Sequence, residues 1–137
     1  MIQITDLSHV TLIIGDISSS KRFYGDVLGM DEVPRPSTFS HAVTWFRKGG
    51  AEVHLIHQPD AAQEPGDKEA QPNEEHDLGR ARHLAFSVED LDETVQALAD
   101  HGVPVVLGPR PRGDGATQMY CRDPDGHLVE LHTPPTM

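Results

Sequence analysis

Two stretches of the chain share one pattern of hydrophobic and polar positions. Apolar side chains occur mainly at every second position over residues 9–14 and again over 83–88, and a period of two is typical of a β-strand. The apolar positions then change to helical spacing over 17–28 and 91–99, with a period of about 3.6 residues. The pattern predicts a strand followed by a helix, twice.

Each predicted helix has residues that mark its beginning and its end. Asp16 and Asp90 stand just before the two helices, where a carboxylate can accept hydrogen bonds from the unpaired amides of the first turn. Gly29 and Gly102 follow the helices, and glycine readily takes the left-handed conformation that ends a helix. We expect the two helices to begin and end at these residues.

The two stretches belong to a longer internal repeat. The offset from His9 to His83 is 74 residues, and the same offset aligns residues 42–48 with 116–122. Both of these runs are predicted strands. With a short strand after each helix and a returning strand after each run, every unit reads strand–helix–strand–strand–strand, or βαβββ.

A hairpin turn separates each of these runs from its returning strand, and the second turn is two residues longer. The returning strands therefore align at an offset of 76 residues, which matches His54 with Glu130. In the strands before the turns, Phe46 is the expected counterpart of Tyr120. Because both positions are aromatic, the ring of Tyr120 could be needed only for packing.

The repeat predicts an α+β fold in one domain of 137 residues. Two tandem βαβββ modules would form a curved mixed sheet around a metal cavity. Module one covers residues 1–57 and module two covers 82–137, and a polar, acidic stretch over 58–81 joins them. A loop of this length without regular structure is unusual inside a compact domain, so we interpret it as a mobile linker or an active-site lid.

Composition narrows the partners and the compartment. The net charge is −11 with histidine neutral, so phosphate backbones and anionic lipid surfaces would repel the chain. We therefore expect a small-molecule substrate and neither nucleic acid nor a membrane as partner. Cys121 is the single cysteine, which excludes an intrachain disulfide and suits a reducing compartment. We expect a cytoplasmic protein.

Four residues at equivalent positions of the repeat form a candidate metal site. His9 is equivalent to His83, and His54 is equivalent to Glu130. If the two modules pack about a pseudo-twofold axis, equivalent residues can meet near that axis. Imidazole and carboxylate ligands suit Zn, Ni, Mn or Fe(II), and the lack of paired cysteines argues against a closed structural zinc site. We predict one divalent metal ion per site.

Each of these residues also has a simpler explanation. A histidine at the start of a strand is more often hydrogen-bonded structure than a ligand, and Glu130 could face solvent on an edge strand. The occurrence of a metal-ligating residue at all four equivalent positions favours the metal site. Arg110 and Arg112, in a loop rich in glycine and proline, could clamp a substrate carboxylate or phosphate or could be solvated, and the sequence leaves both readings open.

Several segments resemble the vicinal-oxygen-chelate superfamily, which contains glyoxalase I, extradiol dioxygenases, fosfomycin-modifying thiol transferases and bleomycin-binding proteins. The resemblance implies paired βαβββ modules, a homodimer, and metal ligands at His9, His83 and Glu130. The segments that carry it are Leu7-Ser-His-Val-Thr-Leu12, Phe23-Tyr-Gly-Asp-Val-Leu-Gly-Met30, Arg82-His-Leu-Ala-Phe86 and Asp123-Pro-Asp-Gly-His-Leu-Val-Glu-Leu131.

The stretches Arg35–Phe39 and Val53–Ile56 are most similar to single-domain glyoxalase-I-like proteins. This resemblance implies a metal-dependent lyase or isomerase that acts on a small substrate with neighbouring oxygens. Glyoxalase I has a glutamate where this chain has His54. The resemblance then leaves Glu130 as the base and His54 as either a metal ligand or a proton shuttle.

Two other activities in the superfamily are alternatives. An Fe(II) extradiol dioxygenase would use His9, His83 and Glu130 as ligands, with His54 as an acid–base residue and Tyr120 as a further catalytic residue. A small-molecule-binding resistance protein, of the bleomycin-binding kind, is the third reading. Its non-catalytic relatives usually lack the ligand set that this chain has.

Overall fold

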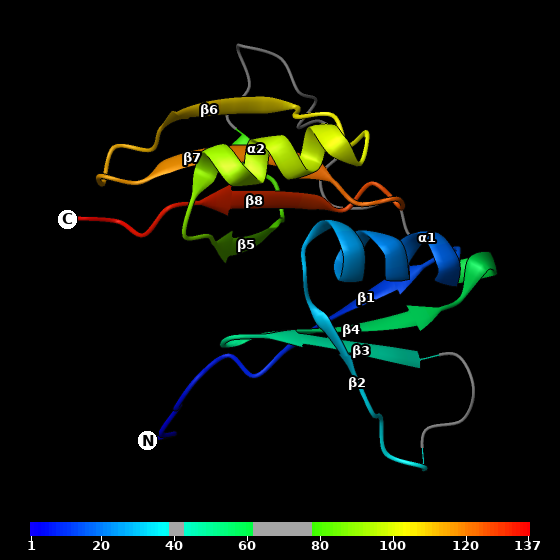
Figure 1. Ribbon diagram of the computed structural model, residues 1–137. Coiled ribbons are helices and arrows are strands. Elements are labelled where there is room, and N and C mark those ends of the chain that lie inside the picture. The colour runs from blue at the N-terminus through cyan, green and yellow to red at the C-terminus, as the bar shows by residue number, and fades with distance from the viewer. Residues whose placement is uncertain (39–42, 62–77) are drawn as a thin grey trace. The chain divides into compact units, whose positions relative to one another are not determined.

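The computed structural model describes residues 1–38, 43–61 and 78–137, which fall into two compact units, Met1–Gln63 and Glu64–Met137. Each unit contains one four-stranded mixed sheet and one main helix (Figure 1). The predicted α+β class is therefore confirmed. Among the described residues no helix is long and apolar enough to cross a membrane. The predicted single domain and the predicted metal cavity remain predictions.

Unit one, residues 1–63, has the strand order β1-β4-β3-β2. Strand β1 is parallel to β4, whereas the other neighbours are antiparallel. A short 3₁₀ turn, Pro59–Ala61, follows the last strand. The elements are β1 (Val10–Ile14), α1 (Ile17–Lys21), a π-helical continuation (Arg22–Val27), β2 (Asp31–Val33), β3 (Val43–Lys48) and β4 (Ala51–His57).

Unit two, residues 64–137, has the equivalent order β5-β8-β7-β6. Strand β5 is parallel to β8, and the other neighbours are again antiparallel. The internal repeat is thus confirmed in both topology and strand direction. The elements are a 3₁₀ turn (Leu78–Arg80), β5 (Leu84–Ser87), α2 (Leu91–Asp100), β6 (Leu107–Pro111), β7 (Thr117–Arg122) and β8 (Leu128–His132).

The predicted helix ends are confirmed in both units. The Asp16 carboxylate accepts a hydrogen bond of 2.8 Å from the Ser19 amide, and Asp90 caps α2 in the same way. Gly29 and Gly102 have φ angles of 73° and 69°, in the left-handed region that ends a helix.

The first helix differs from the regular helix that its sequence predicts. After Lys21 it widens into a π-helix, so that the Leu28 amide donates to the Phe23 carbonyl five residues back at 2.9 Å. The widened turn accompanies the burial of two consecutive aromatic side chains, Phe23 and Tyr24. A helix that continued with the regular period would rotate one of them away from the sheet.

The strand register corrects one expected pairing of the repeat. Trp45 lies opposite His54, and Tyr120 lies opposite Glu130, so Trp45 is the structural counterpart of Tyr120. The expected counterpart, Phe46, pairs with Val53 instead. The cause is that only one of the two extra residues lies in the second hairpin, since His54 follows Trp45 by nine residues and Glu130 follows Tyr120 by ten. The other extra residue lies before Tyr120 and displaces β7 by one position relative to β3.

The alternation of side chains gives each sheet a core face and a site face. In unit one the residues on the helix side include Phe46, Val53 and Leu55, all of which are buried. The opposite face carries the neighbouring cross-strand pair Trp45 and His54. In unit one, His54 therefore lies on the face opposite the apolar core.

The predicted linker lies only partly within the described chain, because residues 62–77 are outside it. Its last residues are packed rather than solvated. Leu78 is fully buried and Ala81 is nearly so, and both belong to an apolar cluster with Tyr120 and Leu128. This packing fixes the chain just before His83.

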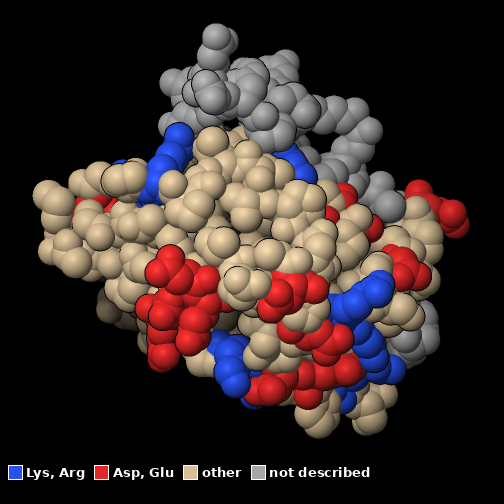
Figure 2. Space-filling model, turned by 45° about the horizontal axis from the view of Figure 1, so that its top comes forward, with Lys and Arg blue, Asp and Glu red and all other residues tan. Residues whose placement is uncertain are grey.

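Acidic residues outnumber basic ones by 22 to 11. Two basic groups near the top of Figure 2 are bordered mainly by tan atoms, whereas in the lower part of the figure lysines and arginines lie beside acidic side chains. Contacts of this kind include Lys21 with Glu32 at 2.9 Å and Lys48 with Asp31 at 3.6 Å. Exposed pairs such as these contribute little to stability.

Candidate functional site

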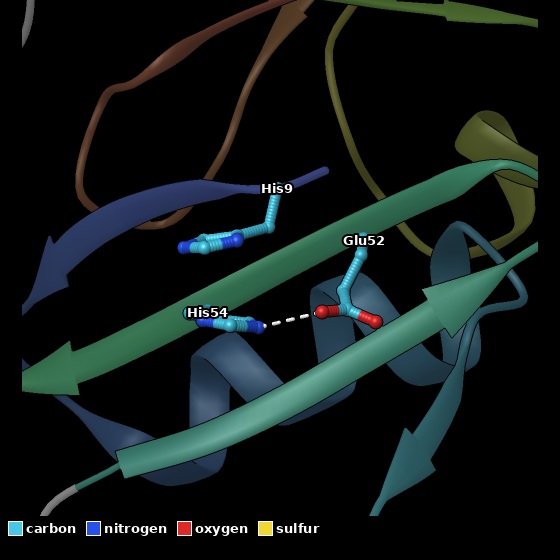
Figure 3. Close-up of side chains that lie close together, drawn as sticks. All are labelled: His9, Glu52 and His54. Atoms are coloured by element: carbon cyan, nitrogen blue, oxygen red, sulfur yellow. Dashed lines mark hydrogen bonds and ion pairs between the residues drawn. The ribbon is translucent and has the colours of Figure 1, made fainter. Parts of the chain in front are cut away.

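In unit one, two of the predicted ligands lie together with a third residue. One ligand atom from each of His9, Glu52 and His54 lies within 4.8 Å of the other two (Figure 3). His9 directly precedes β1, whereas Glu52 and His54 are on β4, two positions apart on the same face. Imidazole nitrogens and carboxylate oxygens suit Zn, Ni, Mn or Fe(II), so the chemistry of these donors fits a divalent ion.

The ring of His54 is stacked between two other rings. Trp45 covers one side, with ring centroids 4.0 Å apart and planes inclined by 4°. His9 stacks on the ring as well, with a centroid distance of 4.0 Å and an angle of 17°. The His54 residue is only 8% exposed. Stacking on both faces therefore holds the imidazole ring, and polar partners can reach its nitrogens only in the plane of the ring.

The Glu52 carboxylate binds one edge of that ring. Its Oε2 is 2.8 Å from His54 Nε2, and its Oε1 accepts from Arg47 Nε at 2.5 Å. Arg47 lies directly opposite Glu52 on β3. The hydrogen bonds from His54 and then from Arg47 hold the pKa of the Glu52 carboxyl below its usual value. Because an ionised carboxylate only accepts, the proton of a neutral His54 lies on Nε2.

In unit two, Glu130 is buried and hydrogen-bonded through both oxygens. Oε1 accepts from Gln118 Nε2 at 2.5 Å and from the Tyr120 hydroxyl at 3.1 Å. Oε2 lies 3.3 Å from Arg112 Nη1 and 4.0 Å from His132 Nε2. The expectation that Glu130 could simply face solvent is therefore wrong.

Arg112 links Glu130 to a second carboxylate. Its Nη2 donates to Asp114 Oδ2 at 2.8 Å, and its Nε also faces the Asp114 oxygens. The ion pair lowers the pKa of the Asp114 carboxyl and, from the other side, raises the pKa of the Arg112 guanidinium. The loop arginine is thus paired within the site face. Arg110, in β6, lies opposite Gln118 in the strand register.

His83 is oriented by its own backbone. Its Nδ1 lies 2.7 Å from the Ala81 carbonyl oxygen, which can only accept, so Nδ1 carries the proton and the lone pair of a neutral ring is on Nε2. A metal-binding histidine commonly donates its other N–H in this way. The ring also meets Tyr120 edge to face, with centroids 5.6 Å apart. His83 and Glu130 therefore both contact Tyr120.

His9 is less tightly defined. Its Nδ1 is 2.8 Å from the Ser8 hydroxyl, which can donate or accept. The residue is exposed, and its firmest contact is the stack on His54. The structure thus brings His9 to His54 in one unit, and in the other it places His83 and Glu130 each in contact with Tyr120. The binding of one ion by all four remains a prediction.

Two polar residues of the site were not expected from the sequence. Glu52 precedes His54 by two positions and Gln118 precedes Tyr120 by two, so each shares a strand face with a candidate residue. That spacing was the available signal. The partners of these residues on the neighbouring strands, Arg47 for Glu52 and Glu130 for Gln118, depend on the cross-strand register, for which the sequence made no prediction.

Cys121 does not contribute to the site. It is fully buried on the core face, opposite Val129. Burial raises the pKa of its thiol to about 12, so the thiol is protonated near neutral pH. A protonated thiol is a poor nucleophile and a poor metal ligand.

Two curated relatives are similar to this chain over most of its length. The chain is 32% identical over 133 residues to the "Probable lactoylglutathione lyase" of Synechocystis sp., covering 91% of this chain and 92% of that protein. It is 30% identical to the metallothiol transferase FosB of Staphylococcus saprophyticus, covering 95% and 78%.

A solved structure shares the fold. The crystal structure of a glyoxalase/dioxygenase from Nostoc punctiforme matches with a TM-score of 0.74 and 28% identity, over 95% of this chain and 91% of that one. Residues 6–131 match the sequence profile of the Glyoxalase/Bleomycin resistance protein/Dioxygenase superfamily. The chain therefore belongs to the Glyoxalase/Bleomycin resistance protein/Dioxygenase superfamily.

Proposed function

We propose that this protein is a divalent-metal-dependent lyase or isomerase that acts on a small substrate with two neighbouring oxygens. The observation that carries the proposal is the buried Glu130 carboxylate, held by the side chains of Gln118, Tyr120 and Arg112. A buried carboxylate costs free energy unless it is paired and hydrogen-bonded. A buried carboxylate with hydrogen-bonded oxygens can bind a divalent ion or move a proton.

The proposed ligands of the ion are His9, His83 and Glu130, with His54 as a fourth ligand or as an acid–base residue. The proposal leaves open whether the two units that supply them belong to one chain or to two chains of a homodimer. His83 presents the Nε2 lone pair that a ligand needs, because its Nδ1 donates to the Ala81 carbonyl.

A bound divalent ion would supply Lewis-acid stabilisation of the oxyanion that develops on the substrate. The chain itself would bind, orient and move the proton. Glu130 or His54 takes a proton from the substrate and returns it to the neighbouring atom. The Tyr120 hydroxyl and the Gln118 amide keep Glu130 Oε1 in one place, so that fewer orientations compete with the reactive one.

A second candidate is an Fe(II) extradiol dioxygenase. The 3.1 Å hydrogen bond between Tyr120 and Glu130 favours it, because the resemblance expects a tyrosine ten residues before the glutamate ligand. In that reaction His54 would act as the acid–base residue beside a catechol. The relatives that transfer thiols suggest a third reaction, in which a thiol adds to a small electrophile.

Metal analysis and turnover together test the proposal. We expect about one divalent ion per site in the wild type and a strong loss of metal in His9→Ala and in Glu130→Ala. His101→Ala is the matched control, since His101 is exposed at the end of α2. Turnover of a dialdehyde–thiol adduct with Ni or Zn supports the lyase. Oxygen uptake with a catechol and Fe(II) supports the dioxygenase instead.

Two outcomes would contradict metal catalysis. Wild-type protein that holds no metal after reconstitution would overturn the proposal. Tight binding of a small molecule that survives chelator treatment, without turnover, would indicate a binding or resistance protein.

The proposed homodimer is tested separately by sedimentation, where one chain's mass in solution would contradict it.

A further inference from the structure

Of the two ring nitrogens of His54, one is left for proton transfer. Its two faces are stacked against Trp45 and His9, and its Nε2 binds the Glu52 carboxylate at 2.8 Å. The side chain is 11% exposed. The remaining ring nitrogen is Nδ1, which carries the lone pair when Nε2 carries the proton. Figure 3 shows Glu52 at one end of the ring and His9 over its face.

The stacking argues against joint metal binding by these two histidines in this arrangement. A metal ion lies close to the plane of the imidazole that binds it, about 2.0–2.1 Å from the nitrogen for zinc. The His9 and His54 rings are inclined by only 17°, with centroids 4.0 Å apart. One ion cannot lie near both planes at that distance from both rings. The geometry therefore favours proton transfer by His54 over a role as co-ligand with His9.

Glu52 is itself held in place. Arg47 donates to its Oε1, while Oε2 receives the bond from His54. Arg47 and Glu52 face each other across the β3–β4 ladder, and the Glu52 side chain is 16% exposed. The carboxylate thus has a partner for each oxygen and cannot turn away from His54 without losing one of them.

We propose that Glu52, anchored by Arg47, is a positioning residue that fixes His54 as the Nε2–H tautomer, so that Nδ1 is the atom that accepts and returns the substrate proton. The proposal rests on the proposed function, in which His54 moves a proton. The step balances within the site. Nδ1 takes the proton from the substrate, the Glu52 carboxylate stabilises the resulting imidazolium, and the same proton returns to the product.

Nitrogen NMR of the histidine side chains tests the tautomer directly. In ¹⁵N-labelled protein above the titration range of histidine, we expect the His54 signals to report protonated Nε2 and unprotonated Nδ1. The absence of these signals in His54→Ala assigns them. Glu52→Ala should shift His54 toward a mixture of tautomers. Glu52→Gln should favour the other tautomer, because its single amide oxygen is held by Arg47, which can only donate, and its amide N–H then faces Nε2. Glu89→Gln, an exposed carboxylate outside the site, is the control.

Kinetics and metal content of the metal-loaded protein supply the second test. We expect Glu52→Ala to lower kcat about 10- to 100-fold with little change in KM, as for loss of acid–base help. Glu52→Gln should lower kcat at least as much, because it favours the other tautomer, and both variants should keep the metal content of the wild type. Loss of metal in Glu52→Ala to the extent seen in His9→Ala would overturn the proposal and make Glu52 a ligand.

The two tests separate this proposal from the proposed function. The tautomer measurement needs neither metal nor turnover, so an unchanged His54 tautomer in Glu52→Ala overturns the positioning role by itself. A wild type without turnover, on the other hand, would contradict the proposed reaction while the tautomer result still stands.

Discussion

Trp45 lies directly opposite His54 on the neighbouring strand, and the two rings are stacked almost parallel, with centroids 4.0 Å apart. In unit two, the register places Tyr120 opposite Glu130 in the same way. Each half of the repeat therefore sets an aromatic ring beside its polar site residue. In unit one the ring covers the flat side of the imidazole, whereas in unit two the ring donates a hydrogen bond through its hydroxyl.

Trp45 is the only tryptophan in the chain, so its fluorescence reports on this contact. We expect Ni²⁺ to quench the emission of the wild type, because a paramagnetic ion at His9 would lie within a few ångströms of the stacked rings. His9→Ala should abolish the quenching at the same ion concentration, while the control His101→Ala should keep it. Equal quenching in His9→Ala would show that the ion binds elsewhere.

The Tyr120 hydroxyl can be removed without removing its ring. Tyr120→Phe keeps the packing against Leu78 and Leu128 but loses the hydrogen bond to Glu130. We expect a stability loss of about 1 kcal/mol, typical of one hydrogen bond, measured by urea unfolding. Metal affinity should fall about 10-fold, as for loss of a group that orients a ligand. Wild-type affinity in Tyr120→Phe would return Tyr120 to a packing role alone.

Local sequence signals were sufficient for the repeat and its elements. The helix caps at Asp16 and Asp90 and the glycines at 29 and 102 are short-range features, and the structure confirms them. The parallel and antiparallel pairing then follows from repeating one βαβββ unit. The predicted counterpart of Tyr120 was wrong, because two residues added to the second unit can be divided between its hairpin and the segment before it in more than one way.

The polar contacts of the site could not be predicted from the sequence, because they depend on strand register and on loop conformation. The contact between Arg47 and Glu52 requires the β3–β4 register, and the contact between Arg112 and Glu130 joins residues 18 positions apart. The loop arginine could equally have been solvated, whereas in the structure it contacts both Asp114 and Glu130. Side-chain direction within a loop depends on such long-range partners.

The Asp16 cap predicts a dependence of stability on pH. The hydrogen bond from the Ser19 amide, the largest cause, lowers the pKa of the Asp16 carboxyl in the folded state. A lowered pKa stabilises the fold above the unfolded value, about pH 4, and that contribution is lost as the pH falls through the folded value. Asp16→Ala should therefore lower Tm at pH 7 and have a smaller effect at pH 3.

Asp16→Asn is the informative companion of that variant. Asparagine caps a helix about as well as aspartate, so its Tm at pH 7 should be close to that of the wild type. Asp92→Asn, in the first turn of α2, changes the same charge without removing a cap. An equal loss of Tm for Asp16→Ala at pH 7 and at pH 3 would contradict a role for the ionised cap.

Arg112 should oppose metal binding at Glu130. Its Nη1 lies 3.3 Å from Glu130 Oε2, so its positive charge competes with a cation for the same carboxylate. Arg112→Gln removes the charge and keeps a polar side chain, and we expect divalent metal to bind about 3- to 10-fold more tightly by calorimetry, from a loss of repulsion partly screened by solvent. Arg22→Gln, an exposed charge in unit one, should leave the affinity unchanged. Weaker binding in Arg112→Gln would mean instead that the guanidinium is needed to orient Glu130, as Gln118 and Tyr120 do.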